Sequence, residues 1–161
     1  PETAYQITSM MQGVVQRGTG RKLKNLNLNL AGKTGTTNKN MDAWFLGFTS
    51  NLVIGTYVGF DEPESLGRYE TGAKAALPIF KQFIQSVVKK QEARPFRIPK
   101  NINFVAVDAD TGLPPSGNTK NIIYESFKPE DKYLAGLEKL TNKDTLKEYD
   151  SNEQIKVLKF Y

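Results

Sequence analysis

The sequence predicts an α+β fold in which a three-stranded antiparallel meander is flanked by helices and followed by a small C-terminal appendage. Two segments, at about residues 3–17 and 77–88, place apolar residues at three- and four-residue steps, the period of a helix that buries one face. Between them, residues 43–49 and 52–60 form two apolar, aromatic and β-branched runs typical of strands. A helix therefore stands on either side of the sheet along the chain.

A change of composition near residue 94 divides the chain. Pro95 and Pro99 block a continuing helix and give this stretch the character of a linker. We therefore expect residues 1–94 to form one packed unit and residues 95–161 to form a linker with a small β-containing appendage. From about residue 128 the sequence is charged and weakly patterned, which predicts a mobile or docking tail.

The first helix is predicted from its apolar stripe and from its two ends. Thr3 is the predicted N-cap, and Gly18-Thr19-Gly20 ends the helix because glycine readily leaves the helical conformation. The stripe consists of Ala4, Ile7, Met10, Met11, Val14 and Val15.

The first predicted strand leads into a lysine-containing motif. Leu26, Leu28 and Leu30 alternate with asparagines, a period of two that gives an extended segment one apolar face. Turn residues at 38–40 follow the motif, and Ser50-Asn51 joins the next two runs. The three strands are therefore expected to form an antiparallel meander.

A second helix and a small hairpin are predicted after the meander. We expect the helix to cover the sheet, with Pro78 tolerated in its first turn. Its apolar stripe consists of Leu77, Phe80, Phe83, Ile84, Val87 and Val88. In the appendage, residues 104–107 and 122–124 flank a Gly- and Pro-rich stretch and predict the hairpin.

The composition excludes several classes of chemistry. The 161 residues include no cysteine and no histidine, which rules out disulfides, thiolate nucleophiles, Ser-His-Asp catalysis and the usual zinc sites. We expect neither a metal nor a cofactor. The sequence has no run of eighteen apolar residues. The net charge is +5, and residues 1–94 carry 12 Lys and Arg against 7 Asp and Glu, which favours an anionic partner.

The segment Leu30–Thr37 carries the most informative chemistry. Lys33 supplies a positive charge, and Thr34 and Thr36 lie two residues apart, which places them on one face of a strand. Gly35 lacks a side chain where a ligand backbone would approach. A cation beside several hydroxyls is suited to holding a carboxylate.

Lys33-Thr34-Gly35 is also the K-T-G motif of the penicillin-recognising enzymes. It lies in a longer run that includes Asp42-Ala43-Trp44-Phe45-Leu46-Gly47-Phe48-Thr49 and Tyr57-Val58-Gly59-Phe60-Asp61-Glu62-Pro63. This run closely resembles the class A penicillin-binding proteins of the 1A type. The resemblance covers about residues 3–90 and, more loosely, residues 96–112.

The resemblance implies part of a penicillin-binding transpeptidase fold and a role for each motif residue. The family's domain is a serine D,D-transpeptidase that cross-links peptidoglycan and is acylated by β-lactams. Lys33 would lend positive potential, and Thr34 and Thr36 would hydrogen-bond the terminal carboxylate of the ligand. The backbone N–H of Thr36 would be one oxyanion-hole donor. With Gly35, these residues would bind a D-Ala-D-Ala stem peptide or a β-lactam.

The resemblance also implies what surrounds this chain. The parent would be a bacterial, bifunctional protein that is also a glycosyltransferase. It would be anchored in the inner membrane, with this part, soluble by itself, on the periplasmic side.

The nucleophilic serine and the second motif of that family precede the lysine strand, so we expect them to lie outside this sequence. Ser86-Val87-Val88-Lys89 and Ser116-Gly117-Asn118 match S-x-x-K and S-x-N formally, but both follow the lysine strand. We interpret Ser86 and Lys89 as ordinary helix residues. The chain is thus expected to be the C-terminal part of a transpeptidase domain, inactive without the N-terminal part of the same protein.

A nucleotide-binding interpretation would start from Gly32-Lys33-Thr34, which imitates the end of a P-loop. The full motif needs glycine where Asn27 stands, and it needs a helix to follow, whereas a turn and a strand follow here.

A basic module that binds nucleic acid or another anionic polymer is the main alternative. It would use the basic excess with Tyr57, Phe60 and Tyr69 as stacking surfaces. These aromatics alternate with aliphatic residues as in packed strands, so we expect no nucleic-acid partner. Salt-dependent binding of single-stranded nucleic acid would support the alternative instead.

Overall fold

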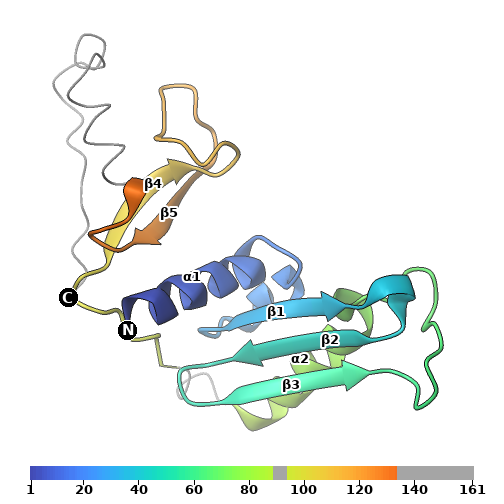
Figure 1. Ribbon diagram of the computed structural model, residues 1–161. Helices are drawn as coiled ribbons and strands as arrows, with labels where there is room; N and C mark the ends of the chain where they lie inside the picture. The colour runs from blue at the N-terminus through green and yellow to red at the C-terminus, as the bar shows by residue number, and fades with distance from the viewer. Residues whose placement is uncertain (89–93, 134–161) are drawn as a thin grey trace, which may run out of the picture. The chain divides into compact units, whose positions relative to one another are not determined.

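The computed structural model describes residues 1–88 and 94–133, which fold into two compact units. One unit is Ile7–Arg97, and the other joins Pro1–Gln6 to the chain from Ile98 onward. Helix α1 (Glu2–Gln16) begins in the second of these units and continues into the first (Figure 1). The boundary between the two units after Arg97 lies three residues beyond the division that the sequence predicts after residue 94.

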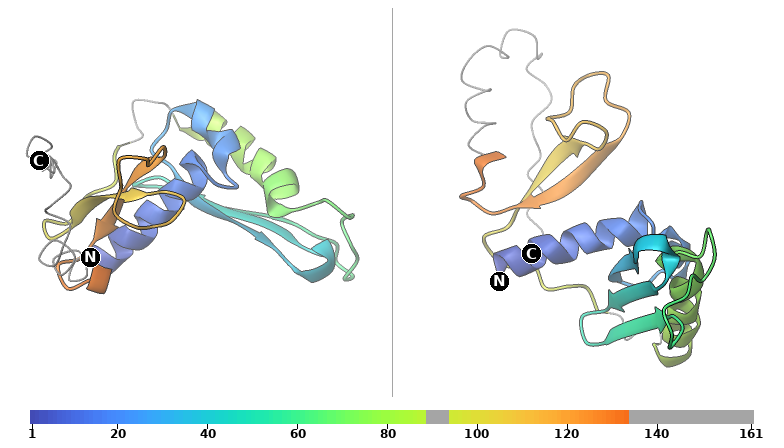
Figure 2. Two further views of the ribbon diagram at one scale, coloured as in Figure 1. Left: turned by 90° about the horizontal axis from the view of Figure 1, so that it is seen from above. Right: turned by 45° about the vertical axis from the view of Figure 1, so that its right-hand side comes forward.

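The unit Ile7–Arg97 is built on a three-stranded antiparallel sheet in the order β1-β2-β3 (Figure 1). Helix α2 covers one face of the sheet, as the views of Figure 2 show. The predicted α+β fold with a three-stranded meander is confirmed. The strands and helix are β1 (Ala31–Thr36), β2 (Ala43–Phe48), β3 (Val53–Val58) and α2 (Leu77–Val87).

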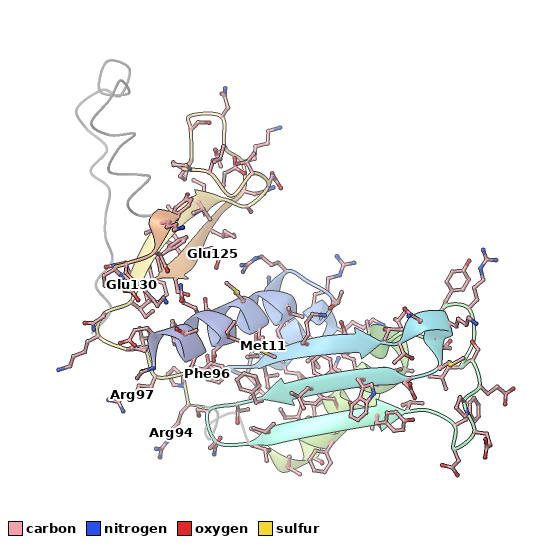
Figure 3. All side chains as sticks on the ribbon, viewed as in Figure 1. Met11, Arg94, Phe96, Arg97, Glu125 and Glu130 are labelled. Atoms are coloured by element: carbon pink, nitrogen blue, oxygen red, sulfur yellow. The ribbon has the colours of Figure 1, made fainter. Side chains whose placement is uncertain are left out.

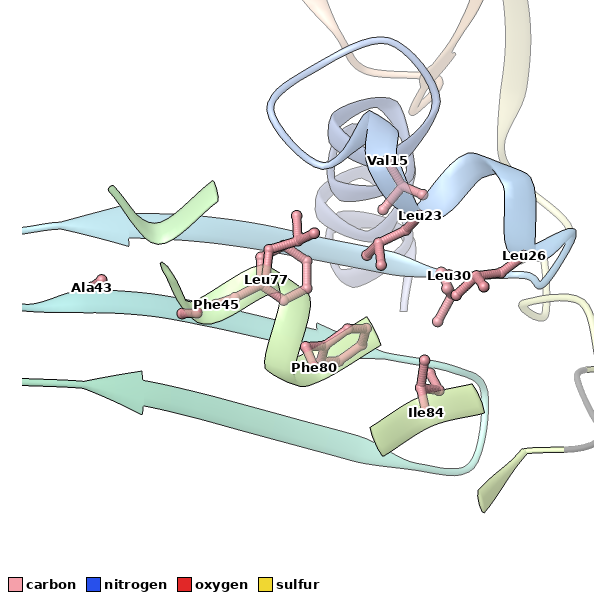
Figure 4. Close-up of a cluster of buried hydrophobic side chains, with 10 residues drawn as sticks. Val15, Leu23, Leu26, Leu30, Ala43, Phe45, Leu77, Phe80 and Ile84 are labelled. Atoms are coloured by element: carbon pink, nitrogen blue, oxygen red, sulfur yellow. The ribbon is translucent and has the colours of Figure 1, made fainter. Parts of the chain in front are cut away.

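The core of this unit lies between β2 and α2. Phe45 and Phe80 are fully buried and point toward one another, with ring centroids 4.7 Å apart (Figure 4). Gly47 leaves room for this pair, because a Cβ atom there would lie 2.6 Å from the Phe80 ring. The hydroxyl of Thr56 lies 3.1 Å from the carbonyl oxygens of both Phe45 and Ala76, which satisfies polar groups inside the core.

Strand β2 alternates between the two faces of the sheet. Ala43, Phe45 and Gly47 are buried, whereas Trp44 and Leu46 are 46% and 47% exposed. A period of two is what a strand with one covered face requires.

The prediction of an extended backbone before the lysine motif is wrong. Residues Arg21–Leu26 form a 3-10 helix (η1), Asn27 adopts a left-handed conformation with φ of 53°, and β1 begins only at Ala31. Leu26 and Leu30 are nevertheless buried. Asparagine tolerates the left-handed region, so a tight turn can deliver the same leucines to the core that a strand would.

Helix α1 begins at Glu2, so the predicted N-cap Thr3 lies inside the first turn. The first hydrogen bond runs from the Tyr5 N–H to the Pro1 carbonyl, at 3.0 Å. The apolar stripe is only partly covered: Val15 is buried, but Ile7 and Met10 are 52% and 58% exposed.

The unit that contains residues 1–6 and 98–133 has a two-stranded hairpin of β4 (Asn103–Asp108) and β5 (Ile122–Phe127), as predicted. Within this unit, the Gln6 amide donates to the Ser126 carbonyl at 3.0 Å and to the Asp131 carboxylate at 2.7 Å. The predicted tail beyond residue 128 lies mostly outside the described residues.

The far end of the unit Ile7–Arg97 is held by an aromatic contact. Phe96, labelled in Figure 3, packs edge-to-face against Phe48 with ring centroids 5.6 Å apart. Pro95, the first proline of the predicted linker, therefore belongs to the same unit as the sheet, whereas Pro99 belongs to the other unit.

Candidate functional site

The lysine motif lies on β1, which is an edge strand. β1 pairs with β2 along one side, and no other strand of residues 1–88 and 94–133 pairs with its second side. We call this second side, at Lys33–Thr36, the β1 edge. An edge strand presents backbone donors and acceptors in fixed geometry to whatever binds there.

The register with β2 decides which face each motif residue occupies. Thr34 lies opposite Phe45, and Thr36 lies opposite Ala43. Phe45 and Ala43 are both buried. Thr34 and Thr36 therefore share the face covered by α2, as their spacing predicts. Lys33 and Gly35 lie on the opposite face, where Gly35 faces Trp44 and its missing Cβ would stand 3.2 Å from the Cβ of Trp44.

The backbone N–H of Thr36 points to the β1 edge. The N–H of the next residue, Thr37, donates to the carbonyl of its partner Asp42 at 3.1 Å, so Thr37 faces β2. Backbone groups in an antiparallel pair alternate between facing the partner and facing away. The N–H and C=O of Thr36, and likewise those of Thr34, must therefore face outward.

Lys33 is exposed, and its ammonium lies at the same edge. It donates to the outward carbonyl of Thr34 at 2.8 Å. A positive charge is thus held beside the outward N–H groups. An approaching anion would meet both.

Each motif threonine has a second partner from a distant segment. The hydroxyl oxygen of Thr36 accepts a hydrogen bond from the backbone N–H of Gly72 at 3.0 Å. The hydroxyl oxygen of Thr34 lies 2.9 Å from that of Thr19, and either atom can be the donor. Neither Gly72 nor Thr19 was predicted as a site residue.

Gly72 begins η3 (Gly72–Ala76), a π-helical turn that leads into α2. A Cβ atom at Gly72 would lie 2.3 Å from the Trp44 carbonyl and 2.4 Å from the Gly35 carbonyl. Glycine is required here, because only a residue without a side chain lets this turn reach the sheet and donate to Thr36.

A hydrogen-bonded cluster fixes the end of β1. Thr37 and Asp42 bond each other twice through side chains, with Asp42 N–H to Thr37 Oγ1 at 2.8 Å and Thr37 Oγ1 to Asp42 Oδ2 at 3.2 Å. The hydroxyl of Tyr57 donates to Asp42 Oδ1 at 2.8 Å. That hydrogen bond to Asp42, with smaller contributions from burial and nearby carboxylates, raises the pKa of Tyr57. Three strands are thereby tied together next to Thr36.

The loop after β3 is anchored to the turn between β1 and β2. The side-chain amide of Asn40 donates to the carbonyls of Gly67 and Arg68, both at 2.9 Å, and the Leu66 N–H donates to the Asn40 carbonyl at 2.9 Å. Asn40 has a positive φ of 55°, which asparagine adopts more readily than most residues. The loop therefore has a defined position at the end of the β1 edge.

The two formal serine motifs are not part of this arrangement. Ser86 donates its hydroxyl to the Phe83 carbonyl one helical turn earlier, at 2.7 Å, and Lys89 lies outside the described residues. The backbone N–H of Ser116 donates to the hydroxyl oxygen of Thr119 at 2.9 Å, within the loop of the hairpin unit.

The part of the chain that the structure describes also bears on metals and membranes. Residues 1–88 and 94–133 contain no group of three or more His, Cys, Asp or Glu side chains placed to hold a metal ion. No helix in the same residues has the length and hydropathy needed to cross a membrane.

Thr19 and Gly72 were missed because nothing local marks them as site residues. Thr19 stands in Gly18-Thr19-Gly20, a sequence typical of a helix end, and Gly72 closes a stretch with Pro63 and Gly67 whose sequence is typical of a loop. Thr19 is 15 residues from Thr34, and Gly72 is 36 residues from Thr36. Only the path of the chain brings these pairs together.

Residues 1–85 match the family described as the penicillin binding protein transpeptidase domain. The chain is 40% identical over 149 residues to penicillin-binding protein 1A of Rickettsia conorii, which covers 92% of this chain and 18% of the relative. It is 43% identical over 130 residues to penicillin-binding protein 1A of Pseudomonas aeruginosa, which covers 80% of this chain and 16% of that protein. The chain thus spans less than a fifth of the length of these relatives.

A solved structure is similar as well. The crystal structure of penicillin-binding protein 1A from Haemophilus influenzae superposes with a TM-score of 0.68 and 31% sequence identity. The similarity covers 80% of this chain and 20% of that one.

Proposed function

The chain belongs to the penicillin-binding protein transpeptidase family, and on that premise we propose that it is part of a serine D,D-transpeptidase that cross-links peptidoglycan stem peptides. In this proposal the β1 edge forms one wall of the site for a D-Ala-D-Ala peptide or a β-lactam. The nucleophilic serine comes from a segment outside this sequence, and the chain alone performs no acyl transfer.

The observation that carries the proposal is the set of donors along the β1 edge. The outward N–H of Thr36, the hydroxyls of Thr34 and Thr36, and the ammonium of Lys33 stand together on one edge strand. An anionic ligand with a reacting carbonyl needs these groups: donors for its carboxylate and an N–H for the oxygen that becomes negative.

The chemistry divides the roles of these residues. The serine oxygen forms a bond to the ligand carbonyl carbon, the carbon–nitrogen bond breaks, and the departing nitrogen takes a proton. The Thr36 N–H stabilises the carbonyl oxygen while it carries negative charge, an effect worth about 3 kcal/mol for one donor. Thr34 and Thr36 hold the carboxylate through their hydroxyls, and Lys33 adds positive potential.

We further propose that the parent protein also carries a glycosyltransferase, as class A family members do, and is anchored in the inner membrane of a bacterium with this part on the periplasmic side. Residues 95–161 would be a linker and an appendage outside the transpeptidase site. The similarity to penicillin-binding proteins 1A supports this proposal.

The test uses the full-length protein that contains this chain. Thr34→Val and Thr36→Val each remove one hydroxyl and keep the side-chain shape. We expect each to slow acylation by a labelled penicillin by roughly 10- to 100-fold, because a hydrogen bond to a charged group is lost. The second-order rate constant of acylation is the measurement.

Thr3→Val serves as the matched control, since Thr3 is an exposed threonine at the start of α1. It should leave the rate unchanged. If Thr34→Val and Thr36→Val were acylated at the normal rate, the β1 edge would not be part of the ligand site.

A further inference from the structure

The hydroxyl protons at the β1 edge constrain how a carboxylate can bind. A threonine hydroxyl has one proton to donate and two lone pairs that accept. An ionised carboxylate only accepts. Thr34 and Thr36 can each bind it only if their single proton is not already donated elsewhere.

At Thr36 a backbone N–H group decides the direction in which the hydroxyl donates. The Gly72 N–H donates to Thr36 Oγ1 at 3.0 Å, so the hydroxyl accepts from the protein and keeps its own proton for a ligand. The close packing of Gly72 against the carbonyls of Gly35 and Trp44 fixes this donor in place.

At Thr34 the corresponding partner is a side chain. Thr19 Oγ1 and Thr34 Oγ1 are 2.9 Å apart, so one of them must donate to the other. If Thr34 donates to a carboxylate, its proton is used, and Thr19 must then be the donor to Thr34. The order is Thr19 to Thr34 to ligand, and successive hydrogen bonds of this kind polarise one another.

The turn that carries Thr19 is built tightly onto the end of α1. The N–H groups of Gly18 and Gly20 donate to the Val14 carbonyl at 3.1 and 3.0 Å. A Cβ atom at Gly18 would lie 2.9 Å from the Val14 Cα, so glycine allows the turn to fold back. Thr19 is exposed and stands between these two fixed residues.

We propose that Thr19 is a positioning residue for carboxylate recognition: its hydroxyl donates to Thr34 and thereby directs the Thr34 proton to the anionic ligand. This inference rests on the proposed function and deepens it. It assigns to Thr19 a part in selecting ligands that carry a negative charge at this position over neutral analogues. Thr36 needs no such side chain, because a backbone N–H does the same for it.

The experiment compares two probes on the full-length protein and its Thr19→Val and Thr19→Ser variants. One probe is a penicillin, and the other is the methyl ester of the same penicillin, which has the same reactive ring without the negative charge. We expect Thr19→Val to slow acylation by the penicillin about five- to tenfold, the effect of one neutral hydrogen bond. Acylation by the ester should change less than about twofold, and Thr19→Ser should restore the penicillin rate.

A purely structural role for Thr19 predicts a different pattern. Equal loss with both probes, or no loss with the penicillin, would overturn the proposal. The Thr3→Val variant and a thermal melt of each variant control for general effects on folding.

Thr36→Val, measured in the same series, separates this inference from the proposed function. If Thr36→Val is slow and Thr19→Val is normal, the role of Thr19 fails and the β1 edge stands. If Thr36→Val is normal, the assignment of the β1 edge fails, and the role of Thr19 fails with it.

Discussion

In the unit Ile7–Arg97, the side chains of Phe45, Leu77, Phe80 and Ile84 are fully buried, whereas the most buried apolar side chain of the described hairpin unit is Val107, at 3% exposure. The loop of the hairpin is fixed by polar contacts. Asp108 Oδ1 accepts from the N–H groups of Asp110 and Thr111 at 2.8 and 3.2 Å, and its Oδ2 accepts from the Thr119 hydroxyl at 3.0 Å.

This difference in packing predicts where a substitution will disturb the site. A close-packed core transmits any change in volume to the elements around it, and the β1 edge lies on that core. Loop hydrogen bonds exposed to water contribute about 1 kcal/mol each and act locally. We therefore expect substitutions to have large effects that reach the site in the first unit and small, local effects in the hairpin.

The largest effect is expected for Phe80→Ala. Removing this buried ring leaves a cavity against Phe45 and Gly47 and should lower the free energy of unfolding by about 3–5 kcal/mol. Phe83→Ala on the same helix is the matched control, because Phe83 is 49% exposed and should cost less than about 1 kcal/mol. Chemical denaturation of the 161-residue chain measures both free energies of unfolding. Equal losses of stability in the two variants would contradict the placement of Phe80 in the core and of Phe83 outside it.

A smaller effect, but one that reaches the site, is expected for Gly72→Ala. The new Cβ meets two carbonyl oxygens, so η3 must move away from the sheet, at a cost of about 1–3 kcal/mol. The Gly72-to-Thr36 hydrogen bond should be lost, and penicillin acylation of the full-length protein should slow.

Gly55→Ala is the control for that substitution. Its Cβ would make only an ordinary contact, 3.4 Å from Leu46 Cδ1, and should leave the acylation rate unchanged. Normal acylation in Gly72→Ala would show that the site does not depend on this turn.

The smallest effect is expected for Asp108→Asn in the hairpin. Asparagine keeps one acceptor oxygen where aspartate uses two, so amide hydrogen exchange in residues 109–121 should speed up about fivefold, while exchange in β1–β3 stays unchanged. Hydrogen exchange with mass spectrometry resolves the two regions. Faster exchange in the sheet would mean that the hairpin loop and the sheet are coupled.

The same carboxylate predicts a pH dependence. The hydrogen bond from the Asp110 N–H, with others from Thr119 and Thr111, lowers the pKa of Asp108 against a smaller opposing effect of burial. Its stabilisation of the loop is therefore complete above its unfolded pKa of about 3.9 and is lost as the pH falls through the lowered folded pKa. Exchange in residues 109–121, corrected for intrinsic rates, should accelerate in that acidic range and be flat near neutral pH.

The sequence by itself determined the elements and the residues of the lysine motif. Period and residue type are local properties, so the meander, the stripe of α2 and the hairpin of β4 and β5 followed from them, as did the shared face of Thr34 and Thr36. The alternation at residues 26–30 predicted which leucines are buried but not the turn at Asn27, because a short apolar pattern fits more than one backbone path.

Only the tertiary structure decided which partners those motif residues receive. Strand register determines that the Thr36 N–H points to the β1 edge, and packing of distant segments brings Thr19 to Thr34 and Gly72 to Thr36. No local pattern encodes such contacts, because a hydrogen bond depends on distance in space and not on separation along the chain. The sequence therefore identifies the donor groups of the site, but the fold sets the direction in which each group donates.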